Sequence, residues 1–219
     1  MNNLQKIGGI AALYLAAAYL VGIVLFLFVL DYPNIVDPAQ KVALVVDQQM
    51  VIYSTNLILY VIFGVFLIML ALALYERLKV GAPAIMQVAT AMGIIWAGSL
   101  VASGMVSNAG IPPIVVLYGQ DPAQAALTWL GIETVARGLG NGNGEILGGL
   151  WTLLVSWAAL RTGGLPQFLN YLGIVVGLVG IISLIPGLRD LVSIFGISQL
   201  VWFVWLALIL LRRSPSAAV

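Results

Sequence analysis

One ionisable side chain stands at the start of a long apolar segment, in the run ETVARGLGNGNGEILGGLW that extends from Glu133 to Trp151. This residue is Glu145, and an ionisable group inside an apolar span is costly and often functional. Its carboxylate could bind a ligand or act as an acid or a base. A carboxylate at a helix N-terminus is also favoured by about 0.3–1 kcal/mol, so Glu145 could instead serve only to begin a helix.

Further polar and aromatic side chains could bind a ligand together with Glu145: Arg137, Asn141, Asn143, Asn56 and Trp151. Each also has an ordinary structural explanation. Arg137 follows Glu133 by four residues, so the two side chains can pair on one helix face. The two asparagines of the glycine run favour turns and helix caps. Asn56 can hydrogen-bond a neighbouring helix, and the tryptophan can pack in a core.

Several chemistries are excluded by residue types that the sequence lacks. The chain has no cysteine and no histidine. It therefore has no disulfide, no thiolate or imidazole metal ligand and no Ser-His triad. The glycine run at residues 138–144 is not followed by the Lys-Ser/Thr of a phosphate-binding loop. We expect no cofactor and no metal, and the net charge of +1 gives no support to nucleic-acid binding.

Apolar residues dominate the composition. Of 219 residues, 62% are hydrophobic and 8% are charged, whereas an ordinary soluble domain is about 25% charged. Lipid must cover so much apolar surface. We predict an all-α fold, a polytopic membrane helix bundle with short outer amphipathic helices, in a single integral membrane domain over residues 1–219. About six transmembrane helices are expected, at residues 7–30, 50–75, 84–106, 138–160, 168–185 and 191–211.

The segments between these spans contain two predicted surface helices. Asp37-Pro38 provides an N-cap and a first-turn proline for a helix that reaches about Asp47. Asp121-Pro122 begins a second helix, which runs to about Arg137.

Two stretches leave the backbone less certain from sequence alone. Ile111-Pro112-Pro113 is expected to break the helix that precedes it. The span at 138–160 requires the glycine run at 138–144 to be helical. The alternative is irregular backbone at membrane depth, which needs cover from protein or water.

The distribution of basic residues predicts an orientation. Six spans place both chain ends on one side, together with six of the nine basic residues: Lys6, Arg77, Lys79, Arg161, Arg212 and Arg213. The other side holds seven of the eight acids. The positive-inside rule therefore places both termini in the cytoplasm, for a multi-pass protein of the cell inner (plasma) membrane.

Two stretches carry a family resemblance: GGLWTLLVSWAALRTGGLPQFLNYLGIVVGLVGI, from Gly148 to Ile181, and LALALYERLK, from Leu70 to Lys79. They resemble a bacterial family of six-span membrane proteins, the domain of unknown function 4386. The resemblance follows the spans in order over most of the chain. It implies a fold and a membrane location without an established activity. Members often carry a His-Glu pair before the Gly-Leu-Trp, where this chain has Gly-Asn-Gly-Glu at residues 142–145.

Three functions are open at this point. The favoured one is a non-enzymatic protein of the lipid bilayer that binds a small apolar or amphipathic, lipid-like ligand, or a membrane partner subunit, in its outer half. A small secondary transporter is the first alternative. An intramembrane enzyme with Glu145 as acid or base is the second, although a lone carboxylate makes a sparse active site.

Overall fold

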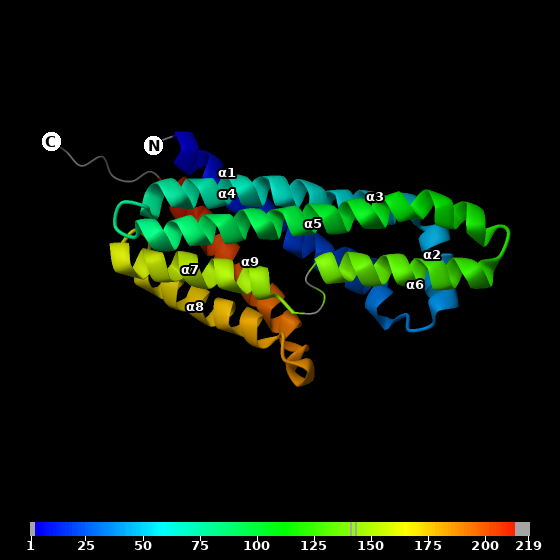
Figure 1. Ribbon diagram of the computed structural model, residues 1–219. Helices are drawn as coiled ribbons and strands as arrows, with labels where there is room; N and C mark the ends of the chain where they lie inside the picture. Colours follow the sequence, from blue (N-terminus) through cyan, green and yellow to red (C-terminus); the bar gives the residue numbers. More distant parts are fainter. Residues whose placement is uncertain (1–2, 141, 143, 213–219) are drawn as a thin grey trace. The chain divides into compact units, whose positions relative to one another are not determined.

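All regular elements in the described part of the chain are helices, in a computed structural model that describes residues 3–140, 142 and 144–212 (Figure 1). The predicted all-α fold class is therefore confirmed. The helices form two compact units. The first contains residues 1–17, 65–97 and 143–219, and the second contains residues 18–64 and 98–142.

The first unit contains a set of closely packed helices. They are the first part of α1 (Asn3–Ile23), most of α4 (Phe63–Leu78), the first part of α5 (Pro83–Tyr118), α7 (Ile146–Thr162), α8 (Gln167–Ile182) and α9 (Leu191–Leu211). α7 packs along α8, and α8 along α9 (Figure 1). A Cβ atom on Gly149 would lie 2.8 Å from the Gly177 carbonyl oxygen, so glycine allows the backbones of α7 and α8 to touch.

Aromatic side chains fill the centre of the first unit. The Trp151 ring is fully buried and lies 5.8 Å from the Trp96 ring and 5.7 Å from the Trp202 ring, measured between centroids. Beside them the Thr152 hydroxyl donates a hydrogen bond of 3.0 Å to the Gln199 carbonyl oxygen. The tryptophan of the Gly-Leu-Trp motif thus has a core-packing role, which is the ordinary explanation of its place in the sequence.

The second unit combines parts of long helices with shorter elements. It holds the end of α1, the π-helical turn η1 (Val24–Val29), the 3-10 turn η2 (Tyr32–Asn34), α2 (Pro38–Asp47), α3 (Gln49–Asn56), the π-helical turn η3 (Leu57–Ile62), the end of α5 and α6 (Pro122–Leu139). Both predicted surface-helix starts are confirmed. The Asp37 carboxylate accepts from the Ala39 N–H at 3.1 Å, and the Asp121 carboxylate from the Gln124 N–H at 3.0 Å.

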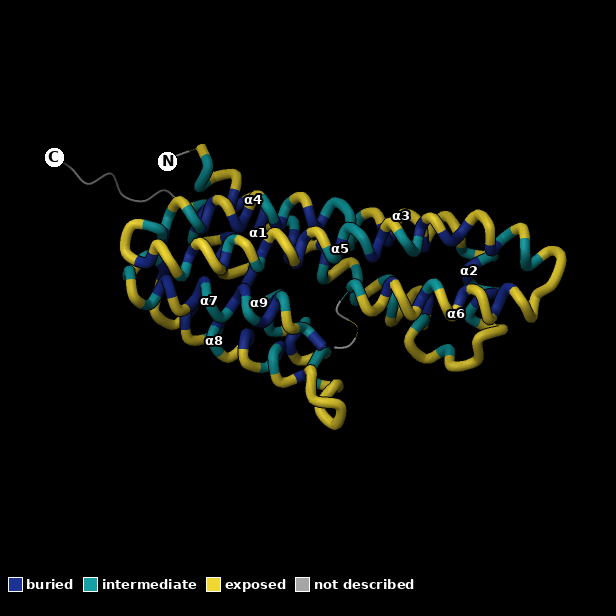
Figure 2. Tube along the Cα trace, in the orientation of Figure 1, coloured by how far each residue is buried: buried dark blue, intermediate teal, exposed yellow. Residues whose placement is uncertain are grey.

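Four helical segments among the described residues are long and apolar enough to cross a membrane: Asn3–Val29, Gln49–Leu78, Pro83–Tyr118 and Leu191–Leu211. α7 and α8 are apolar but shorter, with 17 and 16 residues. Figure 2 shows exposed positions along the apolar helices. They include large side chains such as Phe28, Leu127 and Phe168, which are 78%, 70% and 76% exposed. Such surfaces suit contact with lipid.

The proline pair in α5 does not break the helix, so the expected helix break at Ile111-Pro112-Pro113 is wrong. α5 continues to Tyr118 with Pro112 and Pro113 inside it. Ile111 and Ile114 beside the prolines are buried in the core of the second unit. Burial contributes about 1.5–3 kcal/mol for each such side chain, which is of the same order as the cost of a helix-interior proline, about 3 kcal/mol.

The glycine run does not begin a helix, so the predicted span at 138–160 is wrong at its start. Gly138 belongs to the last turn of α6, and α7 begins only at Ile146. Between them the described residues are not helical. Gly144 has φ +131°, and a Cβ atom there would lie 2.8 Å from the Leu184 α-carbon. Such backbone favours glycine. The described residues between α6 and α7 are therefore irregular, and whether they lie at membrane depth stays a prediction.

Candidate functional site

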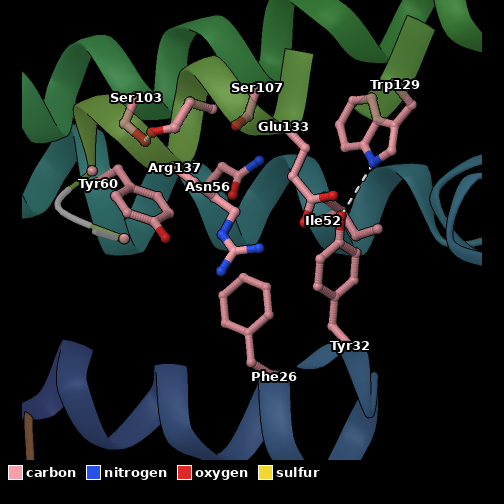
Figure 3. A pocket seen from close by; sticks show the side chains of 13 residues that line it. Phe26, Tyr32, Ile52, Asn56, Tyr60, Ser103, Ser107, Trp129, Glu133 and Arg137 are labelled. Atoms are coloured by element: carbon pink, nitrogen blue, oxygen red, sulfur yellow. Dashed lines mark hydrogen bonds between the residues drawn. The ribbon is translucent and has the colours of Figure 1, made fainter. Parts of the chain in front are cut away.

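A cavity of about 210 Å³ lies within the second unit (Figure 3). Its lining combines aromatic and apolar side chains with hydroxyl, carboxamide and charged groups. The lining residues are Phe26, Tyr32, Ile52, Asn56, Tyr60, Ser103, Ser107, Trp129, Glu133, Ala136, Arg137, Gly140 and Gly142. A cavity with an apolar part and a few polar groups is the usual form of a small-molecule site.

Helical spacing explains why these residues share one cavity. α5 contributes Ser103 and Ser107, which are four residues apart, and α3 contributes Ile52 and Asn56 with the same spacing. On α6 the lining positions are 129, 133, 136 and 137. Residues three or four apart lie on one face of a helix, so each helix presents one face to the cavity.

An ion pair joins α2 to α6 at this site. The Lys41 ammonium lies 3.3 Å and 3.5 Å from the two oxygens of the Glu133 carboxylate. Glu133 is 9% exposed. Lys41 also lies over the Tyr32 ring, 4.9 Å from its centroid. The sequence favoured Arg137 as the partner of Glu133, and the structure shows that this interpretation is wrong.

Tyr32 closes the same polar cluster. Its hydroxyl accepts a hydrogen bond of 3.1 Å from the Trp129 indole N–H (Figure 3). Burial, and then the negative charge of Glu133, raise the pKa of the Tyr32 hydroxyl above its ordinary value. The phenol of Tyr32 therefore stays neutral.

Arg137 points its guanidinium into the cavity from α6, on the side of Phe26 (Figure 3). Among the described residues no carboxylate lies within 4.0 Å of it, since the salt bridges found are Lys41–Glu133 and Lys79–Glu76. The backbone at Arg137 is well held, because its carbonyl accepts from the Gly142 N–H at 2.7 Å. Arg137 is an exposed residue at the rim of the cavity, and its guanidinium has no carboxylate partner in the described part of the chain.

Asn56 also lies in the cavity wall, at the start of a short hydrogen-bond chain. Its side-chain N–H donates to the Asn108 side-chain Oδ1 at 3.0 Å, and the Asn108 side-chain N–H donates to the Tyr53 backbone carbonyl oxygen at 3.1 Å. The predicted interhelical hydrogen bonding of Asn56 is confirmed. Asn108 uses one N–H of this carboxamide, and the second N–H has no partner among the hydrogen bonds of the described residues.

Two other candidates from the sequence belong to the first unit. Glu145 occupies the N-cap of α7, but its side chain makes no capping hydrogen bond. Its Oε2 atom is buried and has no hydrogen-bond partner in the described part of the chain, while its backbone N–H donates to the Ser183 hydroxyl at 3.0 Å. Neither Glu145 nor Trp151 lines the cavity. Asn141 and Asn143 lie outside the described residues.

The structure adds site residues that the sequence did not single out, above all Lys41, Tyr32 and Phe26. Lys41 was an outer-side basic residue without a role, and Tyr32 stood in a loop. Only Ser103 and Ser107 carried a usable signal, as polar positions four residues apart in an apolar helix. Lys41 and Glu133 are about 90 positions apart. A contact over such a separation produces no periodic pattern in the sequence from which it could be predicted.

Fold and site together define a helical membrane protein with a polar cavity. The family model described as "Domain of unknown function (DUF4386)" matches residues 13–212, and the chain belongs to this family. No curated protein and no solved structure matches the chain.

The Lys41–Glu133 pair predicts a difference between two lysine substitutions. Lys41→Met should lower the free energy of unfolding by about 1–3 kcal/mol, because it leaves the largely buried Glu133 carboxylate without its partner. Lys79→Met is the matched control, since the side chains of the Lys79–Glu76 pair are 37% and 47% exposed. Its effect should stay below about 1 kcal/mol. Unfolding of the detergent-solubilised variants measures both values.

Adding Glu133→Gln to Lys41→Met should recover part of the loss, because the double variant removes the isolated charge. Equal stability losses for Lys41→Met and Lys79→Met would contradict a buried role for the Lys41–Glu133 pair.

Proposed function

We propose that this membrane protein binds a small amphipathic ligand in the cavity of its second unit. The proposal rests on one observation: the cavity is lined partly by apolar and aromatic side chains and partly by polar ones. Phe26, Ile52 and Trp129 offer aromatic and apolar surface, whereas Arg137 and Asn56 offer a charge and a hydrogen-bond donor. A ligand with one polar and one apolar part satisfies both kinds of surface.

The surroundings of the cavity support a ligand that arrives from the bilayer. Helices of the second unit expose large apolar side chains, among them Phe28, Leu127 and Leu130. Lipid in contact with these surfaces would bring an amphiphile to the cavity without passage through water. Binding by Glu145 and Trp151, which belong to the first unit, stays a prediction from the sequence.

We place the protein in the cell inner membrane with six spans and both termini in the cytoplasm. Contacts within the first unit support this orientation. The Gln5 side chain donates to the Leu210 carbonyl at 3.4 Å, and the Arg77 side chain to the Gly164 carbonyl at 2.8 Å. These contacts join the start of α1 to the end of α9, and the end of α4 to the turn before α8. Basic residues gather at these helix ends, as the positive-inside rule requires of the cytoplasmic side.

Filling the cavity tests the proposed function. Ser107→Trp places a large ring in the cavity, so the purified variant should lose most of any amphiphile that co-purifies with the wild-type protein. Met105→Trp is the control on the same helix, because Met105 is 60% exposed and does not line the cavity. Native mass spectra of the three proteins measure the bound ligand.

Wild-type protein that carries only a co-purifying polypeptide would favour the partner-subunit function instead. Retention of the same amphiphile by Ser107→Trp at wild-type occupancy would show that the cavity is not its site.

Single-cysteine labelling tests the orientation, because the chain has no native cysteine. Val36 and Val80 are 87% and 90% exposed, so a cysteine at either position should react freely once reagent reaches it. In intact cells an impermeant maleimide should label Val36→Cys, and Val80→Cys should react only after the membrane is opened. Labelling of both positions from the same side would contradict the six-span arrangement.

A further inference from the structure

We propose that the polar group of the ligand is an anion, a carboxylate or a phosphate monoester on a single hydrocarbon chain, and that the Arg137 guanidinium binds it. This inference rests on the function proposed above and names the class of ligand.

The charges around the cavity call for a negative partner. Among the described lining residues Arg137, which is exposed, is the one cation and Glu133 is the one carboxylate. Lys41 lies within 3.5 Å of both Glu133 oxygens, so this carboxylate is already neutralised. The local charge is therefore +1, and it resides on Arg137. A ligand with a cationic headgroup would find no carboxylate available among the described lining residues.

The chemistry of the guanidinium favours an oxyanion with two oxygens. Its planar N–H groups match a carboxylate or a phosphate with two parallel hydrogen bonds. Asn56 lines the same cavity and has one carboxamide N–H left over from its bond to Asn108. Ser107 adds a hydroxyl from α5. An anion between these groups would gain a charge-assisted contact and neutral hydrogen bonds together.

The size of the cavity indicates a single-chain ligand. The cavity volume is about 210 Å³. This space can hold a small headgroup and the first part of one chain, beside Phe26 and Ile52. The rest of the chain would leave along the exposed apolar surface of the second unit.

Four probes test the inference by titration of the delipidated protein in non-ionic detergent: dodecanoate, dodecyl phosphate, the neutral ester monododecanoylglycerol, and inorganic phosphate. Wild-type protein should bind dodecanoate and dodecyl phosphate at least about tenfold more tightly than the neutral ester, since a hydrogen bond to a charged group is worth about 1.5–3 kcal/mol. Inorganic phosphate alone should bind weakly, because it lacks the chain.

Arg137→Gln should weaken binding of both anionic amphiphiles by about 10- to 100-fold and leave the neutral ester unchanged. Arg137→Lys should recover only part of the loss, because an ammonium lacks the planar fork. Arg161→Gln is the matched control: this arginine lies in the first unit, with its guanidinium 5.9 Å from the Trp157 ring centroid. It should bind all probes like wild type.

The outcomes separate this inference from the proposed function. Equal affinity of wild type for anionic and neutral amphiphiles, or an unchanged affinity in Arg137→Gln, would overturn the anionic ligand while cavity binding stands. Tight binding of inorganic phosphate alone would replace the amphiphile by a free anion. Failure of every amphiphile to bind the wild-type protein would overturn the proposed function and this inference with it.

Discussion

The ion pair between Lys41 and Glu133 decides what the second unit can do. It ties α2 to α6 across 92 residues of sequence and neutralises a carboxylate that is almost fully buried. A buried charge must be paired or it destabilises the fold strongly. Because Lys41 satisfies Glu133, Arg137 one turn further along α6 has no described carboxylate partner, and its guanidinium faces the cavity. One pairing thus supports the fold and leaves the exposed Arg137 guanidinium without a described carboxylate partner.

Helix geometry then places the neutral groups around that cation. The α3 and α5 helices each supply two lining residues four positions apart, and small residues keep the helices close enough for these faces to meet. A Cβ atom on Gly104 would lie 2.7 Å from the Tyr60 Cβ, and one on Gly140 would lie 2.7 Å from the Ser103 hydroxyl. In a membrane the lipid is as apolar as the helix surfaces, so the hydrophobic effect does not hold helices together. Close packing of this kind is what stabilises their association there.

Contacts between residues close together in the sequence could be predicted from it. Contacts between residues far apart in the sequence could not. Asp37 and Asp121 cap their helices as predicted, because a cap involves residues only two or three positions apart. The expected Glu133–Arg137 pair was wrong because Lys41, distant in sequence, competes for the same carboxylate. Pro112 and Pro113 remain inside a helix whose neighbouring residues Ile111 and Ile114 are buried, a tertiary contact that the local rule does not include. The sequence grouped Arg137, Asn56, Glu145 and Trp151 as one site, whereas only Arg137 and Asn56 line the cavity.

The central claim is that a cavity in the second unit binds an anionic single-chain amphiphile. Photo-crosslinking tests this claim most directly. A long-chain carboxylic acid with a photoreactive group near its headgroup would be irradiated with the wild-type protein, and the labelled residues would be mapped by mass spectrometry. The account predicts adducts on Phe26, Ile52 or Tyr60 that disappear when dodecanoate is in excess. Adducts confined to lipid-facing side chains such as Phe28 and Leu127, or cavity adducts that excess dodecanoate does not reduce, would contradict it.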